Sequence, residues 1–106
     1  MQSQTQDVLF QYVNRIHEIY GSELKAVILY GSYARGDYTE SSDIDIMILV
    51  DSTEDTIKQK GRMVSDITFD FNLDHDIMIM PIVKNVNHFQ YWLPADPFYK
   101  NVKNEG

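Results

Sequence analysis

The sequence predicts an α/β domain in which a small mixed β-sheet is flanked by helices. Three short apolar runs have the length of buried strands and are bounded by turn-forming or charged residues. Around them, apolar residues recur every three or four positions, as on the buried side of helices. The chain has 106 residues, enough for one modest core and too few for two. We therefore expect residues 1–106 to form a single domain.

The first half of the chain predicts a helix, a strand and a loop. An apolar stripe at helical spacing over residues 8–20 predicts the helix, and Gly21 follows as its C-terminal cap. The polar residues before the stripe have no apolar pattern and are the only candidates for disorder. LKAVILY, residues 24–30, predicts a buried strand that ends at Gly31. Residues 31–42 are rich in Gly and Ser, which indicates a loop with room for one helical turn.

The second half predicts a strand, a helix, a strand and a last helix. Residues 46–50 form the second apolar run, and Asp51-Ser52-Thr53 offers caps for a helix that reaches the low seventies. Residues 77–83 form the third run, where Pro81 predicts an edge strand. A last helix is expected after a cap at Asn85 or Asn87 and before the helix breakers Pro94 and Pro97.

The lengths of the connections predict the strand directions. The loop between the first two strands is too short for a comfortable parallel crossover, so these strands should be antiparallel. About two dozen residues separate the second strand from the third, which allows a parallel crossover through a helix. The sheet is therefore expected to be mixed.

This topology brings acidic residues and a glycine turn to one edge of the sheet. Asp43 and Asp45 lie at the entrance of the second strand, and alternation places both on the same face. Gly31 and Ser32 leave the first strand at that edge, and the third strand enters there after Asp74-His75-Asp76. We therefore expect three carboxylates to converge beside the glycine turn.

Carboxylates so close together repel one another unless a positive charge lies between them. Mg²⁺ suits this arrangement because it prefers oxygen ligands and shares them with substrate phosphates. Gly31 allows a close backbone approach, and Ser32 with the amides after it can hold phosphate oxygens. The pattern indicates in-line displacement at phosphorus on a nucleoside triphosphate.

The same residues resemble a known family. GSYARG followed by SDIDIMIL, within residues 30–50, closely resembles the GSxARG…SDxDLxV signature of the DNA polymerase beta-like nucleotidyltransferase superfamily. The nearest branch resembles the minimal nucleotidyltransferases, small proteins often encoded beside a HEPN partner, and the final PFYKNVKNEG is similar less specifically. The resemblance implies a nucleotidyltransferase fold and Mg²⁺-dependent transfer of a nucleoside monophosphate, AMP from ATP, to a hydroxyl acceptor. A tyrosine of a HEPN toxin is one acceptor that it implies, with this chain as the antitoxin.

The resemblance also implies roles for individual residues. Gly31 and Ser32 would bind the β- and γ-phosphates, and Asp43 and Asp45 would hold two Mg²⁺ ions. The third family carboxylate begins the next strand, where Asp76 fits best because alternation would place it with Met78 and Met80. It would act as general base or second-metal ligand, and Asp74 is the rival candidate. Arg35 would contact phosphate or tie the loop to a nearby carboxylate.

Composition excludes several classes of function. Nine basic and 16 acidic side chains give a net charge of −7 with no basic stripe, which argues against a broad nucleic-acid surface. The absence of cysteine excludes disulfides and thiolate metal sites. We recognise no signal peptide and no apolar run long enough to span a membrane, so a cytoplasmic location is expected.

Two other functions compete with catalysis at this point. A non-catalytic module could keep the fold as an antitoxin or a nucleotide-binding subunit, and an acidic surface suits a basic partner. A plain metal-binding scaffold explains the acids but leaves Gly31 and Ser32 without a role. A homo-oligomer also remains open.

Overall fold

The computed structural model describes residues 3–39 and 41–106 and confirms the expected α/β class. In chain order the elements are α1 (Ser3–Tyr20), η1 (Gly21–Glu23), β1 (Leu24–Tyr30), α2 (Ser32–Arg35), β2 (Ile44–Val50), α3 (Glu54–His75), β3 (Ile79–Asn85), α4 (Val86–Trp92) and α5 (Pro97–Glu105). In this described part of the chain, no helix is both long and apolar enough to cross a membrane.

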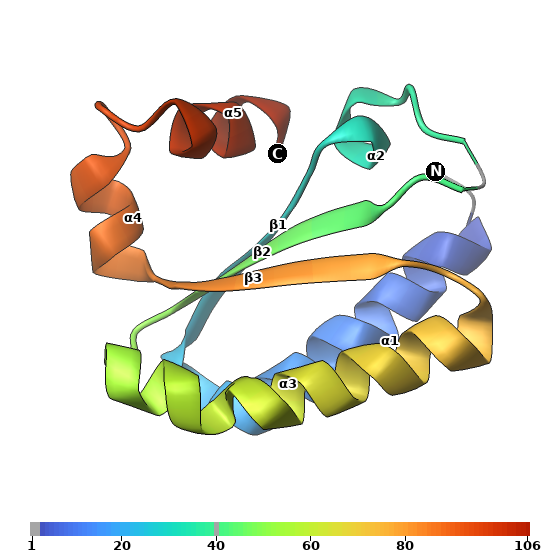
Figure 1. The fold of residues 1–106 in the computed structure, drawn as a ribbon, viewed down its shortest axis with the longest axis horizontal. Coiled ribbons are helices and arrows are strands. Elements are labelled where there is room, and N and C mark those ends of the chain that lie inside the picture. Colours follow the sequence, from blue (N-terminus) through green and yellow to red (C-terminus); the bar gives the residue numbers. More distant parts are fainter. Residues whose placement is uncertain (1–2, 40) are drawn as a thin grey trace.

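The three strands form one mixed sheet in the order β1-β2-β3 (Figure 1). β1 pairs with β2 antiparallel, and β2 pairs with β3 parallel through the α3 crossover, as the connection lengths predicted. β3, which contains Pro81, is an edge strand, so the missing amide of proline interrupts no central ladder. The entrances of β2 and β3 and the exit of β1 therefore lie at the same edge of the sheet.

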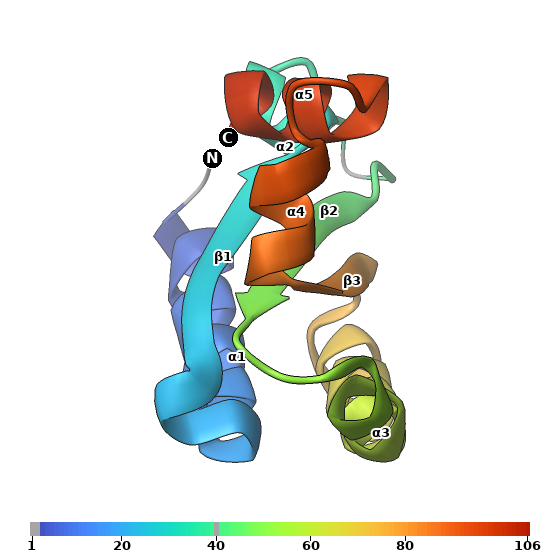
Figure 2. The same cartoon turned by 90° about the vertical axis from the view of Figure 1, so that its left-hand side faces the viewer.

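Helices cover both faces of this sheet (Figures 1 and 2). α1 and α3 cover one face, where a buried cluster contains Tyr12, Ile16, Ile44, Ile46, Ile48, Val50, Val64 and Ile79. α4 and α5 cover the other, where the buried residues are Tyr30, Met47, Leu49, Phe89, Tyr99 and Val102. Successive residues of β2 thus belong alternately to the two cores, as the pleat of a strand requires.

Several boundaries differ from the sequence-based expectations. α1 begins at Ser3 instead of residue 8, because a nucleated helix adds exposed polar residues at little cost. β2 starts two residues early, at Ile44, and β3 both starts and ends two residues late, at Ile79 and Asn85.

A further difference is α5, a helix that was not expected. Pro97 was predicted to break a helix, but it occupies the first turn of α5, where its missing amide costs nothing. The side chain of Asp96 caps this helix by accepting hydrogen bonds from the amides of Phe98 and Tyr99.

Candidate active site

Asp43 and Asp45 lie at the edge of the sheet where β2 begins. Ile44 and Ile46 point into the core beneath α1 and α3, so Asp45, between them, lies on the face covered by α4 and α5. Its partner in the antiparallel register is Tyr30, the last residue of β1. Asp43 directly precedes the strand and is exposed, whereas Asp45 is partly buried. Both acids therefore lie where β2 begins.

Gly31 brings the glycine turn into contact with Asp45. Its backbone has φ 75° and ψ −155°, a conformation almost reserved for glycine. A side-chain carbon at this position would collide with the carboxylate of Asp45. Ser32 follows at once as the first residue of α2, so the turn and the acid form one site.

The electrostatics of Asp45 suit a cation. Burial raises the pKa of the Asp45 carboxyl, the negative charges of Asp43 and Glu105 raise it further, and Arg35 opposes them. Crowded carboxylate oxygens with too little positive charge are the donor set that Mg²⁺ accepts. Within residues 3–39 and 41–106, however, no group of three His, Asp or Glu side chains could hold a metal. Asp43 and Asp45 thus fit Mg²⁺ only as a pair, and any further ligands would have to come from outside the described carboxylates and imidazoles.

Asp76, the expected third carboxylate, lies outside the strand that was to place it beside this pair. Asp76 is the C-terminal cap of α3 in the left-handed conformation, with φ 50° and ψ 51°, and lies outside β3. Asn72 holds this end of the helix, because its side chain bonds both the amide and the carbonyl of Ile79. The alternation that would have grouped Asp76 with Met78 and Met80 therefore does not apply. Asp74, the rival, lies within α3 and is exposed.

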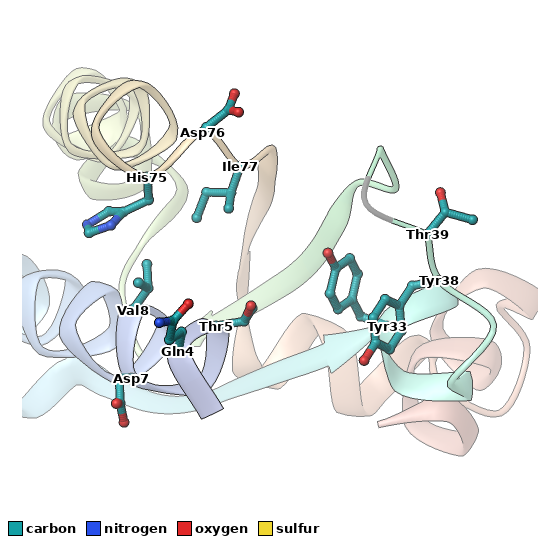
Figure 3. Close-up of a pocket in the computed structure, with 10 residues that line it drawn as sticks. All are labelled: Gln4, Thr5, Asp7, Val8, Tyr33, Tyr38, Thr39, His75, Asp76 and Ile77. Carbon is teal, nitrogen blue, oxygen red and sulfur yellow. The ribbon is translucent and has the colours of Figure 1, made fainter. Parts of the chain in front are cut away.

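A hollow of about 770 Å³ lies beside Asp76 (Figure 3). It is bounded by the first turns of α1, the end of α3, and α2 with the loop after it. The rings of Tyr33, in α2, and Tyr38, in that loop, stack with their centroids 4.3 Å apart. The carboxylate of Asp76 points away from the other labelled side chains. Neither Asp43 nor Asp45 is among its lining residues, so this hollow is separate from the acidic pair.

Glu105, which the sequence did not suggest, completes the candidate site. One of its oxygens, Oε2, accepts a hydrogen bond of 2.7 Å from the amide of Gly31. The other, Oε1, lies 3.0 Å from Nη1 of Arg35, whose Nε also pairs with Asp37 at 3.2 Å. Arg35 thus ties the loop to nearby carboxylates, one of its two expected roles.

Comparisons with known proteins agree with this geometry. The family described as polymerase beta, nucleotidyltransferase, matches residues 12–93. A Methanocaldococcus jannaschii protein with the name "putative protein adenylyltransferase" is 40% identical over 77 residues, covering 73% of this chain and 76% of the relative. A second protein of that organism and name is 38% identical over 96 residues, covering 91% and 88%. The chain is therefore a nucleotidyltransferase of the polymerase beta family, as GSYARG and SDIDIMIL predicted.

Proposed function

We propose that this domain transfers AMP from ATP to a hydroxyl group of another protein. The observation that carries the proposal is the contact between Asp45 and the Gly31 turn, with Asp43 beside them. The names of the two relatives support adenylyl transfer and a protein acceptor. In this reaction the acceptor oxygen bonds to the α-phosphorus as the bond to the β-phosphate bridging oxygen breaks. Pyrophosphate leaves, and the hydroxyl proton passes to water.

Each residue of the pair and the turn has a proposed task. Asp43 and Asp45 would hold two Mg²⁺ ions, which when bound neutralise charge on the phosphate oxygens. The amide of Gly31 and the hydroxyl of Ser32 would hold the β- and γ-phosphates, and the Arg35 guanidinium would add a positive charge beside them. The proposal uses two carboxylates, because Asp76 lies at the end of α3 and is exposed.

The proposed acceptor is a tyrosine of a HEPN toxin, with this chain as its antitoxin. The resemblance of residues 30–50 to minimal nucleotidyltransferases supports this choice, and so does the net charge of −7, which favours a basic partner. The domain needs no nucleic-acid surface for this reaction, because the partner supplies the hydroxyl group.

The test is transfer of label from α-labelled ATP to a purified HEPN protein offered as the acceptor, with and without Mg²⁺. We expect Asp45→Asn to lower transfer by about a thousandfold, because several kcal/mol of charge stabilisation are lost. Asp76→Asn is the matched control and should retain the wild-type rate. The proposal is wrong if wild type neither binds ATP with Mg²⁺ by calorimetry nor transfers label.

A second function, a non-catalytic partner-binding module, is favoured by β3. Met80 is the in-register neighbour of Asp45, and the carbonyl of Met78 accepts the amide of Ile44. Methionines therefore lie beside the acidic pair in β3, whereas Asp76, the expected third carboxylate, lies outside that strand. If the double variant Asp43→Asn/Asp45→Asn protects cells from the toxin as well as wild type does, this function replaces catalysis.

A further inference from the structure

Glu105, near the end of α5, contacts groups of the candidate site but has no task in the proposed function. Its carboxylate accepts the Gly31 amide at 2.7 Å and pairs with Arg35 at 3.0 Å. These are the same amide and the same guanidinium that the proposed function assigns to phosphate oxygens. A carboxylate and a phosphate are both anions with several acceptor oxygens, so they compete for the same donors.

The Gly31 amide has one proton to donate. Once it is bonded to Oε2 of Glu105, a phosphate oxygen can accept it only if the carboxylate moves away. Glu105 also places a negative charge close enough to Asp45 to raise the pKa of that carboxyl. A triphosphate that entered beside both acids would meet additional repulsion.

The helix that carries Glu105 is firmly packed. Tyr99 and Val102 are buried, with 3% and 0% of their surface exposed, in the core between α5 and the sheet. Glu105 lies one turn after Val102, so the same turn of helix that is anchored in the core aims the carboxylate at Gly31. Rotation of the side chain alone can therefore free the amide while α5 remains in place.

We propose that Glu105 is an internal competitor for the triphosphate and that ATP displaces its carboxylate from the Gly31 amide. This inference rests on the proposed function, because it assumes that phosphates bind at Gly31. It makes Glu105 a residue that sets nucleotide affinity and selects for ligands with β- and γ-phosphates. Only a ligand that carries these phosphates reaches the amide, so AMP does not compete with Glu105.

The first test measures ATP and AMP binding by calorimetry with Mg²⁺ and without acceptor. We expect Glu105→Ala to tighten ATP binding about five- to tenfold, the equivalent of about 1 kcal/mol for one competing hydrogen bond. AMP binding should not change. Asp37→Asn is the matched control, because it removes a negative charge from Arg35 but leaves Glu105 on the Gly31 amide. Its ATP affinity should stay within about twofold of wild type.

The second measurement needs no substitution. In the wild-type chain, the amide resonance of Gly31 and the side-chain carboxyl resonance of Glu105 should both shift when ATP or inorganic triphosphate is added, and not with AMP. If triphosphate binds while both resonances stay in place, Glu105 is not displaced and the inference is wrong.

The outcomes separate this inference from the proposed function. If a folded Glu105→Ala variant binds ATP no more tightly than wild type, while wild type transfers label, the competitor role of Glu105 is wrong. The proposed function then stands. If the Glu105→Ala variant binds ATP more weakly, the competitor role is also wrong, and the Glu105 carboxylate instead holds the Gly31 turn in place. If neither protein binds ATP, both the proposed function and the inference are wrong.

Discussion

The two faces of β2 differ sharply although their residues alternate along one strand. Ile44, Ile46 and Ile48 point into the core beneath α1 and α3 and are 0%, 2% and 0% exposed. On the other face, Met47 and Leu49 are equally buried, but Asp45 precedes them at the edge of the sheet. The pleat turns adjacent residues of β2 to opposite faces, so the isoleucines stabilise the core while Asp45 lies in the candidate site.

The edge itself also differs between the two faces. On the side of α1 and α3, the end of α3 is held to β3 by Asn72, and Asp76 remains outside. On the side of α4 and α5, Gly31 and Asp45 meet beneath Glu105. Asp45 and Glu105 thus lie on the face where the loop after β1 and the last helix meet. The candidate site therefore depends on α5 as well as on the motif.

The largest expected effect comes from the apolar face. Ile46→Ala should lower the free energy of unfolding by about 2–5 kcal/mol, because it leaves a cavity in a core that cannot close over it. Urea denaturation followed by circular dichroism measures this loss. ATP binding per folded molecule should stay unchanged, because Ile46 points away from the acidic pair.

The matched control lies across the sheet. Met80 is in register with Asp45 and is 47% exposed, so Met80→Ala should change the free energy of unfolding by about 0.5 kcal/mol or less. Equal losses at Ile46 and Met80 would contradict the difference between the buried core beneath α1 and α3 and the exposed position beside Asp45.

Much of this fold could be predicted because its signals are local. LKAVILY gave β1 with both ends correct, and the lengths of two connections gave the strand directions. The motif placed Gly31, Asp43 and Asp45 at one edge, since all three are fixed by short-range alternation and by one hairpin-like pairing.

Asp76 and Glu105 could not be placed in the same way. The end of α3 depends on Asn72 reaching Ile79, a contact that no periodicity reveals, so the strand was predicted two residues too early. Glu105 meets Gly31 across 74 positions of sequence. Its helix was missed because Pro97 was treated as a breaker, although Asp96 followed by Pro97 is a recognised start signal.

Substitutions at two glycines separate the effect of backbone strain from the effect of the contact with Asp45. Gly31 and Gly36 both have positive φ, at 75° and 85°, but only Gly31 is in contact with a neighbour, Asp45. Gly36→Ala should cost about 1–2 kcal/mol of stability through backbone strain, with ATP binding retained. Gly31→Ala should cost about 1–3 kcal/mol and also abolish ATP binding, because its new carbon displaces Asp45.

Thermal unfolding and calorimetry on the two variants supply these values. The contact between the turn and the acid would lose its proposed importance if Gly31→Ala bound ATP as tightly as Gly36→Ala.

The smallest expected effect concerns the folding stability that is lost when the carboxyl group of Asp45 is ionised. Burial, Asp43 and Glu105 raise the pKa of Asp45 in the folded chain above its ordinary value of 3.8. As the pH rises from that value through the folded pKa, the folded state retains a proton that the unfolded state has lost, so folding stability falls. Asp45→Asn removes this loss and should raise the melting temperature at neutral pH in a metal-free buffer, with no difference at about pH 3. Asp66→Asn, at an exposed position of α3, is the control for removal of one carboxylate far from the site. A melting temperature lowered by Asp45→Asn at neutral pH would mean that the charge of Asp45 stabilises the fold. Asp45 would then stabilise the fold, as the isoleucines on the opposite face of β2 do.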